Sequence, residues 1–125
     1  MDRKGFEAVI AEALDGLPLE FAELMSNVSI QVREAPDVAT LRSLDLDPRH
    51  HTLFGLYTGV PLDERGGWYG NVLPDVIVLY RRPLLDYWCE TGQSLEAIVR
   101  NTLIHEIGHH FGFSDDDMER IEAEL

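Results

Sequence analysis

Hydrophobic residues recur at helical spacing near the start of the chain. Apolar side chains lie three or four positions apart over residues 3–15, and Gly16 and Pro18 follow directly. This spacing predicts an amphipathic helix over residues 3–15, because glycine and proline commonly end helices. A second, short helix is expected from Pro18 to Met25, since proline fits the first turn of a helix.

Alternation of apolar and polar residues then replaces the helical spacing. Val28, Ile30 and Val32 alternate with polar neighbours, which predicts a half-buried strand. Residues 34–52 are interrupted by prolines and aspartates, so we expect mostly loop there. Residues 53–60 (LFGLYTGV) predict a second strand, in which the glycines indicate a bulge or a close approach of another backbone.

The second half of the chain alternates between loop, strand and helix patterns. A glycine-rich polar loop is expected over residues 61–74, and the apolar run DVIVLY at residues 75–80 predicts an interior strand. A helix should begin near Pro83, and Ser94 is the expected N-cap of another. Apolar side chains occupy most faces of that last helix, so it should be the most buried helix of the protein.

Length and charge limit the classes of function. The chain has 125 residues, and we expect a single domain over residues 1–125. Its formal net charge of −13 argues against binding to nucleic acid or to an anionic membrane surface. This charge is typical of a soluble surface, and a preference for basic peptide segments is the functional alternative. No apolar run approaches the length of a membrane span.

Cysteine content and the N-terminal residues bear on location. Cys89 is the single cysteine, so no internal disulfide can form, and we expect its thiol to be buried. Residues 1–18 carry charges throughout and lack the apolar core of a signal peptide. Both features are typical of a cytoplasmic protein. They do not determine the oligomeric state, and both are compatible with a monomer.

The segment from His105 to Asp115 concentrates the chemistry of the chain. It is HEIGHHFGFSD and fits the pattern H-E-x-x-H-x-x-G-x-x-D. His105 and His109 would be about 40° apart around a helix and about 6 Å apart along it, so both imidazoles can reach one ion. Glu106 is turned about 100° from His105, where it can act as a general base on a metal-bound water.

Gly112 and Asp115 extend the motif beyond the helix. Gly112 permits a positive φ and can end the helix, after which Asp115 can return as a third ligand. The fourth position then stays open, as in catalytic zinc sites, and zinc is the ion that this ligand set favours. Two alternatives remain for Asp115. It or a neighbour could cap a final helix over residues 116–124, and Glu119 could supply the third ligand.

Other polar side chains are weaker candidates for the site. His110 would be turned about 140° from His105 and cannot share its ion, so we expect it to be packed or on the surface. Tyrosines are candidates for stabilising an oxyanion, and no pattern chooses among them. They are Tyr57, Tyr69, Tyr80 and Tyr87.

The motif resembles that of the zincin metallopeptidases, some of which carry aspartate as the third ligand. Together with the short chain and the segments LFGLYTGVPL and DVIVLYRRPL, it is similar to the minimal zincins, a bacterial family of very small predicted zinc metallopeptidases. The resemblance covers most of residues 53–118. It implies a compact α/β (α+β) fold, in which a small mixed sheet of about three strands packs on a central HExxH helix with flanking helices.

The same resemblance implies an activity. His105, His109 and Asp115 would hold one Zn²⁺ per chain, and Glu106 would be the catalytic base of a metallopeptidase acting on a peptide or protein. Residues 53–60 would form an edge strand that pairs with the substrate backbone, or an ordinary strand without that role. The alternatives are a zinc-binding regulatory or interaction domain with little turnover, a zinc hydrolase of a non-peptide amide, and a structural helix with a fortuitous motif.

Overall fold

The structure, a computed structural model, describes residues 1–58 and 75–123. Its helices and strands are α1 (Arg3–Asp15), α2 (Leu19–Leu24), the 3₁₀ turn η1 (Met25–Asn27), β1 (Val28–Arg33), α3 (Val38–Ser43), β2 (Gly55–Thr58), β3 (Asp75–Tyr80), α4 (Arg81–Thr91), α5 (Leu95–His110) and α6 (Asp115–Ala123). This mixture of helices with one small sheet confirms the predicted α+β class. No helix in these two ranges is long and apolar enough to cross a membrane.

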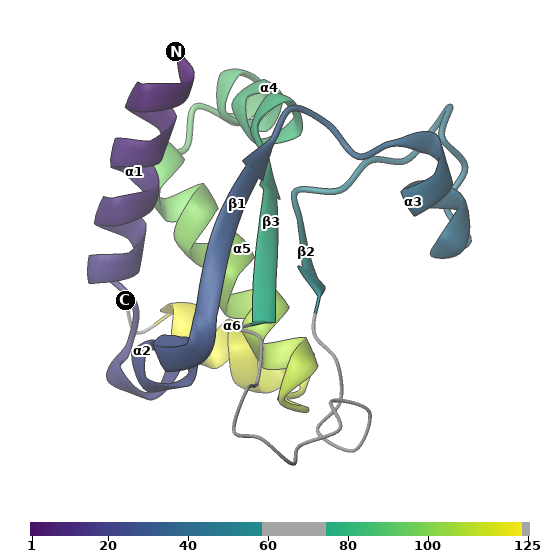
Figure 1. The fold of residues 1–125 in the computed structure, drawn as a ribbon. Coiled ribbons are helices and arrows are strands. Elements are labelled where there is room, and N and C mark those ends of the chain that lie inside the picture. Colours follow the sequence, from purple (N-terminus) through teal and green to yellow (C-terminus); the bar gives the residue numbers. More distant parts are fainter. Residues whose placement is uncertain (59–74, 124–125) are drawn as a thin grey trace, which may run out of the picture.

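The three described strands form one mixed sheet in the order β1-β3-β2 (Figure 1). β3 runs parallel to β1 and antiparallel to β2. Four consecutive residues of β3, from Ile77 to Tyr80, are buried, which confirms the prediction of an interior strand. β2 occupies an outer position in the described sheet, next to β3.

Helix α5 lies behind the sheet and packs against α1, with α2 and α6 near its C-terminal end and α4 at its other end (Figure 1). It has seven buried residues, more than any other described element. The Ser94 hydroxyl accepts a hydrogen bond from the Ala97 N–H at 3.3 Å and so caps the helix as predicted. The motif is therefore carried by an element that is anchored along its length in the core.

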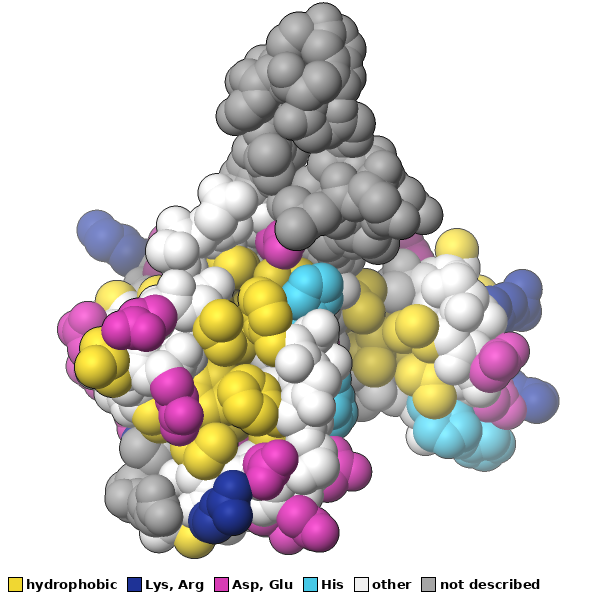
Figure 2. Space-filling view, turned by 90° about the horizontal axis from the view of Figure 1, so that it is seen from below, with side chains coloured by type: hydrophobic (Ala, Val, Ile, Leu, Met, Phe, Trp, Pro, Cys, Tyr) yellow, Lys and Arg dark blue, Asp and Glu magenta, His cyan; other side chains and the backbone are white. Residues whose placement is uncertain are grey.

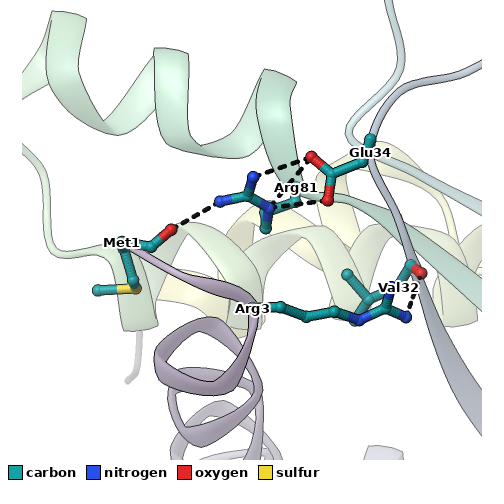
Figure 3. Close-up of polar contacts among 5 residues, drawn as sticks. All are labelled: Met1, Arg3, Val32, Glu34 and Arg81. Carbon is teal, nitrogen blue, oxygen red and sulfur yellow. Dashed lines mark hydrogen bonds and ion pairs between the residues drawn. The ribbon is translucent and has the colours of Figure 1, made fainter.

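Polar contacts join the N-terminus to the end of the sheet opposite the motif (Figure 3). The Arg81 guanidinium donates to the Glu34 carboxylate at 2.9 Å and to the Met1 carbonyl at 2.6 Å. Hydrogen bonding from Arg81 lowers the pKa of Glu34. Arg3 donates to the Val32 carbonyl at 2.8 Å. These contacts connect α1, β1 and α4 at a distance from the motif.

One prediction is incomplete and another is wrong. Residues 34–52 are mostly loop and turn, as predicted, but residues 38–43 form the helix α3, because Asp37 caps it through a 2.7 Å hydrogen bond from the Thr40 N–H and Leu41 is buried. The neighbouring prolines and aspartates flank this short helix without interrupting it. Cys89 is exposed rather than buried, because the last turn of α4, residues 89–91, extends beyond the core.

Candidate metal centre

A tight turn brings the chain back along α5. The helix ends at His110, and Gly112 follows with a φ of 84°, a conformation that side chains with a β-carbon rarely adopt. The Phe113 N–H then donates to the Gly108 carbonyl at 2.8 Å, which closes the turn. This confirms the prediction that Gly112 redirects the chain, and it places Asp115 at the start of α6.

The cap of α6 is Ser114, not Asp115. The Asp117 N–H donates to Ser114 Oγ at 3.1 Å, and the Ser114 N–H donates to the Asp117 carboxylate at 3.4 Å. This reciprocal pair is a capping box, so a neighbour of Asp115 caps the final helix. The Asp115 carboxylate is therefore not used as a cap, and its Oδ1 lies 3.1 Å from His109 Nε2.

Close packing between α5 and α6 holds this return segment in place. A β-carbon at Gly108, within the motif, would collide with the Met118 sulfur, and Met118 is completely buried. Glycine at this position therefore lets α6 lie directly on α5. The side chains at the start and end of α6 reach the histidines of α5 for this reason.

His105, His109 and Asp115 come together on the exposed side of α5. Each offers a ligand atom, and these three atoms lie within 4.8 Å of one another. From this end of the molecule, histidine side chains come to the surface among hydrophobic and acidic ones (Figure 2). Two imidazole nitrogens and a carboxylate oxygen are donors that zinc takes at about 2.0–2.2 Å, with a fourth position left open. The donor set and its spacing therefore fit a zinc ion.

Glu106 lies beside this cluster and against β2. The Tyr57 backbone N–H donates to Glu106 Oε2 at 3.1 Å. Burial raises the pKa of Glu106 above its ordinary value, although the Tyr57 hydrogen bond and the neighbouring His109 and His105 oppose this rise. A carboxylate with a raised pKa is a stronger base, which suits proton transfer near neutral pH.

We expect Glu106→Gln to stabilise the metal-free protein at neutral pH but not in acid. Because the folded-state pKa of Glu106 is raised, its ionisation opposes folding. This cost is absent below the unfolded-state pKa and grows as the pH rises through the folded-state pKa. The Tm of the variant should exceed that of the wild type by about a few degrees near pH 7.5, and the two should converge near pH 4. Thermal unfolding in the presence of a chelator measures both, and a constant difference would contradict the prediction.

The sequence pattern does not single out Glu122, yet the structure places it at the site. Its Oε1 lies 2.7 Å from His105 Nε2, and its side chain is 20% exposed. Glu122 lies outside the motif, and its contact depends on how α6 packs on α5. The available signal is helical spacing, since Asp115, Met118 and Glu122 fall on one face of a helix.

His110 packs against the edge of the sheet, as predicted, and is not part of the metal cluster. Its ring stacks on Tyr57 with centroids 3.9 Å apart, and its Nε2 lies 3.9 Å from the Asp75 carboxylate. The Tyr57 hydroxyl donates to the same carboxylate at 2.6 Å. These contacts fix Tyr57 relative to the end of α5, and so they also fix the N–H that bonds Glu106.

The tyrosines differ in their position relative to the site. The Tyr57 hydroxyl is bonded to Asp75, Tyr80 is buried in β3 at 4% exposure, and Tyr87 lines a cavity beside the site. Tyr69 and the predicted loop over residues 61–74 lie outside the described residues. No described tyrosine hydroxyl is therefore assigned to an oxyanion here.

A cavity of about 440 Å³ adjoins Glu106. Its walls come from the segment that leads into β2, from α4 with the residues that follow it, and from α5 and α6. His105, Glu106 and Glu122 are among its lining residues. The Phe54 and Tyr87 rings, whose centroids are 5.1 Å apart, contribute apolar surface. A molecule that fills this cavity would contact Glu106.

Comparison with known proteins agrees with this geometry. The chain has no match among curated proteins. A family described as zincin-like metallopeptidase matches residues 25–125, a range that contains the sheet, the cavity and the whole motif. The match covers most of the chain and supports the resemblance to the minimal zincins. The chain therefore belongs to the zincin-like metallopeptidase family.

Proposed function

We propose that the protein is a zinc-dependent peptidase in which His105, His109 and Asp115 hold the ion and Glu106 is the general base. The observation that carries this proposal is the position of a half-buried glutamate beside a His₂Asp cluster, in the wall of a cavity. Membership of the zincin-like metallopeptidase family supports the same activity.

The chemistry divides between the ion and the chain. A zinc ion held here would supply a Lewis acid that polarises the scissile carbonyl and acidifies water. Glu106 would take a proton from the attacking water and deliver it to the leaving amine. The Tyr57 N–H holds Glu106 Oε2 at 3.1 Å, which leaves the other carboxylate oxygen for the proton. Burial of Glu106 raises its pKa and so strengthens it as a base.

Pairing of a substrate backbone with β2 remains part of the proposal. β2 has an outer position in the described sheet, as such a role requires. The Tyr57 N–H is already bonded to Glu106, so a substrate strand would have to bond to other positions along this edge. Substrate binding would therefore leave the orientation of the base undisturbed.

Metal analysis combined with a peptide digest tests the proposal. The purified protein should hold one zinc per chain and cleave a mixed peptide library, and a chelator should stop cleavage until zinc is restored. Zinc occupancy without cleavage of any peptide would favour the alternative of a zinc-binding interaction domain. Failure to bind zinc after reconstitution would refute both.

A further inference from the structure

We propose that the cavity beside Glu106 is a subsite for a basic side chain, lysine or arginine, of the substrate residue next to the cleaved bond. This inference rests on the proposed peptidase function and adds a substrate class to it. Because His105 and Glu106 line the cavity, a side chain inside it belongs to a residue adjacent to the bond on which Glu106 acts.

The walls of the cavity suit the stem of a long side chain. Phe54, Tyr87 and Ile98 provide apolar surface along it. The volume of about 440 Å³ falls within the range of small-ligand sites. Lysine and arginine bury their methylene groups against such surfaces while their charged ends reach polar partners. The shape therefore admits an extended chain of carbons with a polar end.

The charges around the cavity favour a cation at that end. Glu106 and Glu122 both line it, and none of its described lining residues is a lysine or an arginine. An acidic substrate side chain would be repelled by both carboxylates, whereas a cation would be attracted to them. The zinc ion that His105 would hold adds two positive charges beside the cavity, and the carboxylates of Asp115, Glu106 and Glu122 together outweigh them. The net charge of −13 over the whole chain also attracts cationic substrates.

One lining residue also carries an oxygen that lacks a hydrogen-bond donor. Asn101 Oδ1 is shielded from solvent and accepts no hydrogen bond from the described residues. Glu122 Oε1, by contrast, is already engaged by His105 Nε2 at 2.7 Å. Buried acceptors are normally satisfied. An ammonium group carries three donors and a guanidinium group five, so a basic side chain could satisfy the Asn101 oxygen and still meet the Glu122 carboxylate, where an apolar one would not.

Digestion of a peptide library before and after lysine acetylation tests the subsite. With zinc-loaded protein, lysine or arginine should be enriched about tenfold or more at one position beside the cleaved bonds. Acetylation keeps the stem of lysine but removes its charge, so it should abolish the lysine enrichment and leave the arginine enrichment. Glu122→Gln should reduce both enrichments to about twofold, while Glu119→Gln, an exposed change on the same helix, should preserve them.

A binding measurement separates this inference from the proposed function. Fluorescence anisotropy with the Glu106→Gln protein would compare a dye-labelled Ala-Ala-Lys-Ala-Ala peptide with its acetyl-lysine counterpart. Preference for the charged peptide that Glu122→Gln removes would support the subsite even if no peptide were cleaved. Cleavage without enrichment of basic residues would overturn the subsite and leave the peptidase intact.

A second variant is needed because Glu122 contacts His105, a proposed zinc ligand, so that a change at Glu122 can also affect the metal. Asn101→Leu removes the unpaired oxygen without touching a carboxylate, and it should lower the preference for basic residues several-fold with zinc content unchanged. If Asn101→Leu keeps both zinc and the full preference, Asn101 has no part in the subsite and the proposal fails. Glu122→Lys reverses the charge at this position, and it should shift the substrate preference towards acidic residues.

Discussion

Glu106→Gln should lower peptide turnover by about two to four orders of magnitude while the zinc content stays unchanged. Glutamine keeps the size of the side chain and can accept the Tyr57 hydrogen bond through its amide oxygen. It cannot take a proton from water at neutral pH, so the predicted loss is confined to the chemical step. Initial rates on a cleaved peptide, measured beside metal analysis of the same preparation, check both parts of the prediction.

Glu119→Gln is the matched control for this substitution. Glu119 is exposed on α6 and is not part of the cluster that could hold an ion, so its variant should keep wild-type turnover. A rate within about twofold of wild type for Glu106→Gln would mean that another group serves as the base. Loss of zinc in that variant would place the Glu106 carboxylate among the ligands instead of beside them.

The elements that carry the motif could be predicted because their signals are local. Apolar side chains around α5, the Ser94 cap and the positive φ of Gly112 each depend on a few consecutive residues. The same is true of β3, whose continuous apolar run marks an interior strand. The spacing from His105 to Asp115 placed three candidate ligands together because a helix and a tight turn have nearly fixed geometry.

The remaining features depend on contacts between distant segments. The Tyr57 N–H bonds Glu106 because β2 lies along α5, and that bond joins residues 49 positions apart. Glu122 reaches His105 because Gly108 admits Met118 between the two helices. No periodicity in the sequence specifies how close two helices pack. The helix α3 was missed for a different reason, since prolines and aspartates beside a six-residue helix predict loop.

Asp115→Ala should weaken zinc binding by about a hundredfold or more and leave the fold intact. It removes one of three ligand atoms that lie within 4.8 Å of one another, and even groups that only orient ligands commonly contribute about 10- to 100-fold to metal affinity. α6 should persist, because Ser114 and Asp117 form its cap without help from Asp115. Competition with a chromogenic chelator measures the affinity, and circular dichroism checks the helix content.

Asp116→Ala is the control for this change, because Asp116 is the next residue of the same exposed turn and lies outside the cluster. It should bind zinc as tightly as wild type. If Asp115→Ala also keeps full affinity, Asp115 is not a ligand, and the carboxylate nearest to the histidines becomes the candidate. That carboxylate is Glu122, 2.7 Å from His105 Nε2, and Glu122→Gln in the same chelator assay would then lose zinc where Asp115→Ala does not. The two variants therefore decide which end of α6 completes the metal centre.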